Sequence, residues 1–145
     1  MLKLSKKSDY GLIALKHLAT QGDDMSCSAA DIAALYNISA PLLAKVLQKL
    51  ARKGLVVARH GSSGGYTLAR NPSEITALEV ISAIDGPLFI TNCMKETGEC
   101  FQTATCTVRE PLRRVNDSIR QVLNTVTILH LTEDLQGSAV VELRT

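Results

Sequence analysis

The fold is decided by residues 41–70, which have the sequence PLLAKVLQKLARKGLVVARHGSSGGYTLAR. In the first half of this stretch, apolar residues recur at helical spacing and predict a helix from Pro41 to Lys53, with a glycine as its stop. The second half predicts two short strands, 55–58 and 66–69, joined by a turn of glycine and serine. The stretch therefore predicts a helix that is followed directly by a β-hairpin.

The predicted helix has two different faces. Its apolar stripe consists of Leu42, Leu43, Val46, Leu47 and Leu50, whereas the other side carries Lys45, Gln48, Lys49 and Arg52. A solvated basic face is the simplest interpretation when this helix is considered alone. The hairpin that follows favours a surface for a polyanion, because its glycines let backbone approach a phosphate or the floor of a DNA minor groove.

Two further helices are predicted upstream. The first spans residues 4–19, and the second runs from Ser28 to Asn37, where Ser28 and Asp31 form an acidic variant of the capping box. A short break separates the second helix from the one that begins at Pro41. Two short helices, a tight turn, a basic outer face and a following hairpin together predict a winged helix-turn-helix domain.

The distribution of charge agrees with a nucleic-acid partner for the first half of the chain. Residues 1–70 carry ten Lys and Arg against four Asp and Glu, whereas residues 71–145 carry six against ten, so the net charges are +6 and −4. We therefore expect only the first half to contact double-stranded DNA. The candidate DNA contacts are Pro41, Leu42, Lys45, Gln48, Lys49, Arg52, Arg59, His60, Gly61, Ser62, Ser63, Gly64 and Gly65.

A fourth helix, a cysteine-rich loop and a long helix are predicted downstream. Thr76 and Glu79 form the capping box of the fourth helix, and the long helix begins either at a box of Thr107 and Glu110 or with Pro111 in its first turn. Beyond the loop, steps of four and three residues predict a heptad seam for pairing with a second copy, with packing on the protein's own first helix as the alternative. The seam consists of Val108, Leu112, Val115, Ile119, Val122, Val126 and Leu129.

The expected fold is mainly α with a small β-hairpin wing. We expect a winged helix-turn-helix DNA-binding domain in residues 1–86 and a cysteine loop for cluster binding in residues 87–107. Residues 108–145 are expected to form a dimerisation helix and a C-terminal tail, with a short further helix after Thr127. The chain is therefore predicted to be a DNA-binding unit joined to a long dimerisation helix.

Three of the four cysteines lie close together, at Cys93, Cys100 and Cys106, in a segment without apolar periodicity. Their spacing lacks the C-x2-C pairs that are typical of structural zinc sites. Soft thiolates on a long loop favour an iron–sulfur cluster, with zinc or a redox-switching thiol set as alternatives. Cys106 precedes the long helix, whose positive end stabilises an anionic group, and Arg109 adds charge of the same sign.

Three thiolates leave a fourth ligand position open. The candidates are Asp9, Glu96, Glu99, His130 and an exchangeable small molecule. A weak or oxygen ligand at that position makes a cluster reactive, which is typical of sensors. Asp9 also has a simpler interpretation, as a solvated acid in the first turn of a helix. His17 is expected in the core or at its boundary, and Cys27 is expected to be semi-buried.

No other chemistry is indicated by the sequence. We find no acid–base pair, catalytic triad or phosphate loop in its required context, so we do not expect an enzyme. No run approaches the length of a membrane span, and no secretory segment is recognised. The irregular cysteine pattern does not suit a secreted disulfide framework, and we expect a cytoplasmic protein with reduced thiols.

Taken together, these motifs resemble the Rrf-two superfamily of bacterial winged-helix regulators, of the IscR, NsrR and SUF-operon regulator type. The resemblance covers nearly the whole chain and rests on LKLSKKSDYG, ADIA, ISAPLLAKVLQKLARKGLV, RHGSSGGYTLAR, EVISAIDG and the three cysteines ahead of the long helix. It implies a homodimeric, iron–sulfur cluster-dependent transcriptional regulator that binds a palindromic operator. A repressor of iron–sulfur assembly genes, of the SUF or ISC kind, is the function that it favours.

The chain departs from the IscR pattern at the fourth ligand, because Arg109 occupies the place of that type's histidine. Asp9 matches the position at which the NsrR type uses an aspartate from the partner subunit. The resemblance thus implies Cys93, Cys100, Cys106 and Asp9 as ligands and favours a 4Fe–4S over a 2Fe–2S cluster. A nitric oxide or redox-sensing repressor of the NsrR type is one alternative, and an iron–sulfur scaffold or carrier without DNA function is another.

Overall fold

The computed structural model of the protein describes residues 3–22, 24–62, 64–90 and 107–133. Cys93, Cys100 and Cys106 therefore lie outside the described residues, as do Glu96 and Glu99. Ser63 of the hairpin turn also lies outside them.

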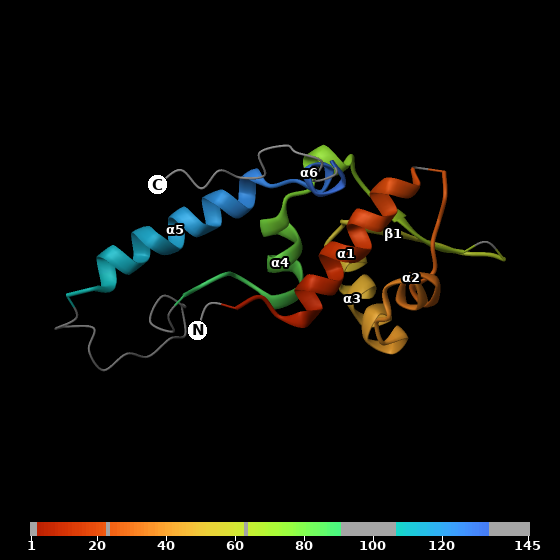
Figure 1. The fold of residues 1–145 in the computed structure, drawn as a ribbon, viewed down its shortest axis with the longest axis horizontal. Helices are drawn as coiled ribbons and strands as arrows, with labels where there is room; N and C mark the ends of the chain where they lie inside the picture. The colour runs from red at the N-terminus through yellow and green to blue at the C-terminus, as the bar shows by residue number, and fades with distance from the viewer. Residues whose placement is uncertain (1–2, 23, 63, 91–106, 134–145) are drawn as a thin grey trace.

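In the described residues, three helices come first, then a β-hairpin, then helices again (Figure 1). The elements are α1 (Lys6–Gln21), α2 (Ala29–Tyr36), α3 (Ala40–Arg52), β1 (Val56–Arg59), β2 (Gly65–Leu68), the 3-10 helix η1 (Pro72–Glu74), α4 (Ala77–Asp85), α5 (Arg109–Thr125) and α6 (Ile128–Thr132). The predicted mainly helical fold with one β-hairpin is confirmed, and the element bounds differ from the predicted ones by a few residues. None of the helices in the described ranges is both long and apolar enough to cross a membrane.

Side-chain caps fix where several of these helices begin. The hydroxyl of Ser28 accepts the Asp31 N–H at 3.0 Å, and that of Thr76 accepts the Glu79 N–H at 3.2 Å, so both predicted helix starts are confirmed. The long helix differs, because Val108 is its N-cap and supplies no side-chain hydrogen bond. Of the two predicted starts, α5 uses the one with Pro111 in its first turn.

The core forms where α1 crosses α3, α4 and α6 (Figure 1). The apolar face of α3 contributes four buried side chains, those of Leu43, Val46, Leu47 and Leu50. Gly11 of α1 allows the closest approach, because a β-carbon at this position would lie 2.4 Å from Cδ1 of Ile84 in α4. A side chain at residue 11 would therefore force the Ile84 side chain to move.

The hairpin packs as a third layer against the link before α2. Strands β1 and β2 are antiparallel, and Arg59 lies opposite Gly65 in their register. The outer edge of β2 pairs with Cys27, whose N–H donates to the Tyr66 carbonyl at 3.1 Å and whose carbonyl accepts the Tyr66 N–H at 2.8 Å. This bridge ties the hairpin to the segment that leads into α2.

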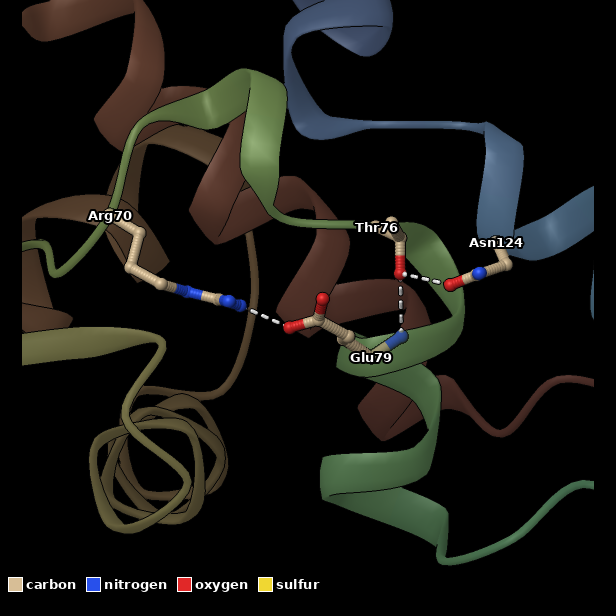
Figure 2. A network of polar contacts seen from close by, with 4 residues as sticks. All are labelled: Arg70, Thr76, Glu79 and Asn124. Atoms are coloured by element: carbon tan, nitrogen blue, oxygen red, sulfur yellow. Dashed lines mark hydrogen bonds and ion pairs between the residues drawn. The ribbon is translucent and has the colours of Figure 1, made fainter.

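The long helix α5 projects from the body and is attached at its C-terminal end (Figure 1). Figure 2 shows the polar side of this attachment, where the Thr76 hydroxyl donates to the Asn124 side-chain oxygen at 3.2 Å. Arg70, beyond the hairpin, forms an ion pair with Glu79 in α4 beside it. These contacts join the base of the hairpin, the start of α4 and the end of α5 in one cluster.

The predicted seam is interrupted at the end of α5. The helix ends at Thr125, so Val126 and Leu129 do not continue it as the seven-residue pattern predicted. The Val126 carbonyl instead accepts the Ala77 N–H at 2.8 Å, and the chain turns inward to bury Ile128 completely. The burial of Ile128 and the backbone pairing with the start of α4 stabilise the fold by more free energy than one further turn of an exposed helix would.

Candidate nucleic-acid interface and cysteine segment

The outward face of α3 carries the side chains expected to contact DNA. Pro41, Lys45, Gln48 and Arg52 are all exposed and follow one another at steps of four, three and four residues, opposite the buried stripe. Leu42 is only half-exposed and lies beside the buried stripe. A helix of this kind, about 10–12 Å across with its side chains, matches the width of the B-DNA major groove. The outward face therefore carries two cationic side chains and one side-chain amide on a helix that is narrow enough to enter the major groove.

The turn before α3 sets the orientation of this face. Asn37 ends α2 in the left-handed conformation with φ of 55°, which asparagine tolerates better than most residues. Ser39 then caps α3, with its hydroxyl accepting the Leu42 N–H at 3.5 Å. Three residues, 37–39, therefore connect the two helices, which is the length of turn that a helix-turn-helix requires.

Lys49 differs from the other basic residues of α3. Its ammonium group donates to the Ile84 carbonyl, at 3.3 Å, in the last turn of α4. The structure thus gives this predicted DNA contact a partner within the protein.

Arg59 at the end of β1 is oriented by a neighbour that the sequence analysis missed. Its Nε donates to the hydroxyl of Thr67 at 3.4 Å, and Thr67 is only 6% exposed. The sequence gives little indication of this contact, because a single threonine at an inward position of a short strand does not mark a partner for an arginine. His60 follows directly and is exposed, as are Gly61 and Ser62 at the start of the turn.

The three glycines of the hairpin have different structural roles. A β-carbon on Gly61 would meet no atom within 4 Å, whereas one on Gly64 would lie 2.7 Å from the Arg59 carbonyl oxygen. At Gly65 it would lie 2.4 Å from the carbonyl carbon of Cys27. Gly64 and Gly65 therefore have a reason to be glycine inside the protein, and only Gly61 opens onto free space.

Cys27 lies beneath the hairpin, half-buried, as expected. Burial raises the pKa of its thiol above the usual value, and the nearby carboxylate of Asp31 raises it further. The thiol is therefore held in its neutral form, in contrast to the thiolates that bind metals. Cys27 contributes to the structure through its backbone bridge to β2.

The described residues around the cysteine segment show how its ends are held. The Asn116 side-chain oxygen accepts the Ile90 N–H at 3.0 Å, and Asn116 is 3% exposed in the middle of α5. The segment returns at the N-terminus of α5, where Arg109 is exposed. The described residues on the two sides of 91–106 therefore both adjoin α5, Ile90 through this hydrogen bond and Val108 as the N-cap, although nothing in the sequence marked Asn116 for this role.

The candidate fourth ligands in the described residues lie in different places. Asp9 is exposed in the first turn of α1, one residue after Ser8, whose hydroxyl donates to Asp85 at 2.6 Å near the exit from α4. His130 lies in α6, and its Nδ1 accepts the Thr127 N–H at 3.1 Å. Because the 17 residues of α5 span about 25 Å, His130 lies roughly a helix length from the start of α5. His17 is buried, with Nδ1 2.9 Å from the Tyr36 hydroxyl.

No group of three or more metal-ligating side chains occurs within the described ranges, which leave out the three clustered cysteines. The donor chemistry of the chain nevertheless fits an anionic cluster. Thiolates are soft ligands, and the N-terminus of α5, without a side-chain cap, presents N–H groups beside the end of the segment.

Comparison with known proteins identifies the chain by its sequence and its fold. A model of the Rrf2 family, described as iron-dependent transcriptional regulators, matches residues 4–134. CymR, the global cysteine regulator of B. subtilis, is 31% identical, with a TM-score of 0.78 over 91% of this chain and 97% of that one. CymR of Staphylococcus aureus is 28% identical, with a TM-score of 0.73 over 90% and 98% of the two chains. T. potens IscR is 27% identical, with a TM-score of 0.72 over 97% and 93%.

Gly65→Ala is expected to detach the hairpin from the link before α2, because the new β-carbon would overlap backbone that cannot rotate away. We expect a loss of about 1–3 kcal/mol in the free energy of unfolding. Amide hydrogen exchange should accelerate at Cys27 and Tyr66, whose N–H groups form the bridge. Gly61→Ala is the control, since its positive φ adds strain without a clash, and equal exchange at the bridge in both variants would contradict this account.

Proposed function

The chain belongs to the Rrf2 family of DNA-binding transcriptional regulators, and from this premise we propose that it is a homodimeric, iron–sulfur cluster-dependent regulator of a palindromic operator. The observation that supports the proposal best is the outward face of α3. It exposes cations and an amide on a helix whose opposite face is fully buried in the core. We propose further that the regulated genes belong to iron–sulfur cluster assembly, with repression as the mode of action.

In the proposed complex, α3 enters the major groove with Pro41, Lys45, Gln48 and Arg52 directed toward it. Gln48 has donors and an acceptor suited to a base edge, whereas Lys45 and Arg52 can bind guanine or phosphate. The hairpin follows along the adjacent minor groove and the phosphates, with Arg59 held by Thr67 and His60 beside it. Leu42, Gly61, Ser62, Ser63, Gly64 and Gly65 complete the proposed contact surface.

The second subunit is proposed to pair through α5. Val115 and Val122 lie seven residues apart on this helix and are 48% and 42% exposed, although both are apolar. Val108, the N-cap of α5, precedes Val115 by seven residues and is also exposed. A row of exposed apolar residues at this spacing is typical of a helix that pairs with a copy of itself. The pairing would join two DNA-binding units with two-fold symmetry, as a palindrome requires.

The ligands proposed for the cluster are Cys93, Cys100, Cys106 and Asp9, with Asp9 supplied by the partner subunit. Asp9 suits this role because it is exposed at the start of α1, and a carboxylate oxygen completes the set of three thiolates. A bound cluster would supply a group whose gain or loss depends on iron, oxygen or nitric oxide. The protein's own contribution is to hold the ends of the segment, through Asn116 on Ile90 and the N-terminus of α5.

The comparisons include a second kind of regulator, because CymR of B. subtilis is described as a global cysteine regulator. Its identity to this chain, 31%, is close to the 27% of T. potens IscR, so similarity alone does not decide between the two kinds of regulator. Three clustered thiols ahead of the positive end of a helix favour a cluster, and the resemblance of Asp9 to the ligand position of the NsrR type favours 4Fe–4S over 2Fe–2S. A nitric oxide-sensing repressor uses the same ligand set and is the alternative within the family.

Cys100→Ala is expected to abolish the visible absorbance of protein purified without air, because it removes one of the three proposed thiolates. Iron and sulfide analysis should show a loss of the bound cluster in the same sample. Cys27→Ala is the matched control, since Cys27 lies under the hairpin and its removal should leave the absorbance unchanged. Full absorbance in Cys100→Ala would remove this cysteine from the proposed ligands.

Lys45→Met is expected to weaken binding to a duplex with the protein's own promoter and to a scrambled duplex alike, because a phosphate contact does not depend on sequence. The slope of log affinity against log salt concentration should fall in magnitude by about 0.9, which corresponds to one released counterion. Fluorescence anisotropy at several salt concentrations measures both quantities. An unchanged slope would argue against a phosphate contact by Lys45.

Val122→Asp is expected to convert the dimer to a monomer, because it places a charge in the apolar seam of α5. We expect the dimer dissociation constant to rise by at least about tenfold, which corresponds to roughly 1.4 kcal/mol. Light scattering coupled to size-exclusion chromatography measures the change. Gln121→Asp adds the same charge at the adjacent exposed position and should remain dimeric, and a dimeric Val122→Asp protein would disprove the seam.

A further inference from the structure

We propose that Lys49 is a positioning residue that ties the recognition helix α3 to the last turn of α4, and that it does not contact DNA. The proposal rests on the DNA-binding function proposed above. It assigns to Lys49 a part in discriminating between DNA sequences, with no part in neutralising phosphates.

Lys49 lies at the border between the outward face of α3 and the side that adjoins α4. It follows Lys45 of the outward face by four residues and Val46 of the buried stripe by three, so its side chain lies between the two. Val46 points into the junction of three helices, where its Cγ1 lies 3.5 Å from the place of a β-carbon on Gly11 of α1. From this border position the ammonium group of Lys49 is directed to the Ile84 carbonyl of α4.

The partner of Lys49 is a group that favours a cation. The last carbonyls of a helix have no intrahelical N–H partner and form the negative end of its dipole. In α4 the Ser82 carbonyl is satisfied by the Gly86 N–H at 3.0 Å, and the Ile84 carbonyl accepts the Lys49 ammonium. Lys49 thus caps α4 from a neighbouring helix, although it is an exposed residue.

The last turn of α4 is itself held against α1. The hydrogen bond from Lys49 to this turn therefore joins α3 to a fixed part of the structure. The Ile84 side chain is 5% exposed and fills the space that Gly11 leaves beside α1. The next residue, Asp85, accepts hydrogen bonds from the hydroxyls of Ser5 at 2.7 Å and Ser8 at 2.6 Å. Two consecutive residues of α4 are thereby held against α1, and Lys49 connects α3 to this fixed point.

A hydrogen bond that holds the orientation of α3 should affect base contacts more than phosphate contacts. Base contacts depend on the angle and depth of α3 in the groove, whereas phosphate contacts tolerate small shifts. Loss of the tie should lower the affinity for the operator and leave non-specific binding nearly unchanged. A phosphate contact would give the opposite pattern, since both affinities would fall along with the salt dependence.

The experiment compares Lys49→Met with Lys45→Met, which make the same change four residues apart on α3. Affinities are measured with anaerobically purified full-length protein, on the promoter duplex and on a scrambled duplex, at several salt concentrations. For Lys49→Met we expect about a tenfold loss on the promoter duplex, less than about a twofold change on the scrambled one, and an unchanged slope. Lys49→Arg keeps a cation within reach of the Ile84 carbonyl and should restore the preference for the promoter.

Several outcomes would overturn the role of Lys49. A fall in scrambled-duplex affinity and in salt slope like that of Lys45→Met would show a phosphate contact. Equal losses of affinity for both duplexes, with an unchanged salt dependence, would show only that less of the protein is folded. An unchanged affinity for the promoter duplex would show that the hydrogen bond from Lys49 to Ile84 has no effect on DNA recognition. If Lys49→Met fails to fold, Lys49→Arg is decisive, because loss of its promoter preference would refute a tie that any cation can make. Wild-type protein with no preference for the promoter would instead refute the proposed function together with this inference.

Discussion

The structure depends on the contact among α1, α3 and α4 at Gly11. A β-carbon there would lie 2.4 Å from Ile84 in α4, and Val46 of α3 is at 3.5 Å. Because the junction fixes which residues of α3 face inward, it also fixes which residues face outward. The orientation of Lys45, Gln48 and Arg52 is therefore a consequence of core packing. The face of α3 that is proposed to contact DNA is thus oriented by the packing of α3 against two other helices.

A second close approach places the hairpin. Gly65 lies against the backbone of Cys27, and a single β-bridge between Cys27 and Tyr66 attaches the two-stranded sheet to the segment before α2. A two-stranded hairpin alone is marginally stable in water, so this attachment and the Arg70–Glu79 ion pair give it a fixed base. Gly64 and Gly65 of the turn are thus required by close contacts within the protein, whereas Gly61 faces open space.

The long helix is joined to the rest of the described structure at two places. Its C-terminal end is joined to the start of α4 by backbone pairing and by the hydrogen bond between Thr76 and Asn124, which Figure 2 shows. The side chain of its buried Asn116 accepts a hydrogen bond from the Ile90 N–H. The same fold is found in a cysteine regulator and in IscR, so the fold does not by itself decide what a member of the family responds to.

The sequence by itself determined the helices that have strong periodicity or a side-chain cap, the hairpin, and the two faces of α3. These features depend on residues three or four positions apart, such as Ser28 with Asp31, which a sequence displays directly. Only the tertiary structure decided the end of α5 at Thr125, the bridge of Cys27 to Tyr66, and the partner of Lys49. Each of these joins residues that are 35 or more positions apart, with Lys49 and Ile84 as one example. Such pairings depend on how helices pack in three dimensions, and a local pattern of residues carries no record of that packing.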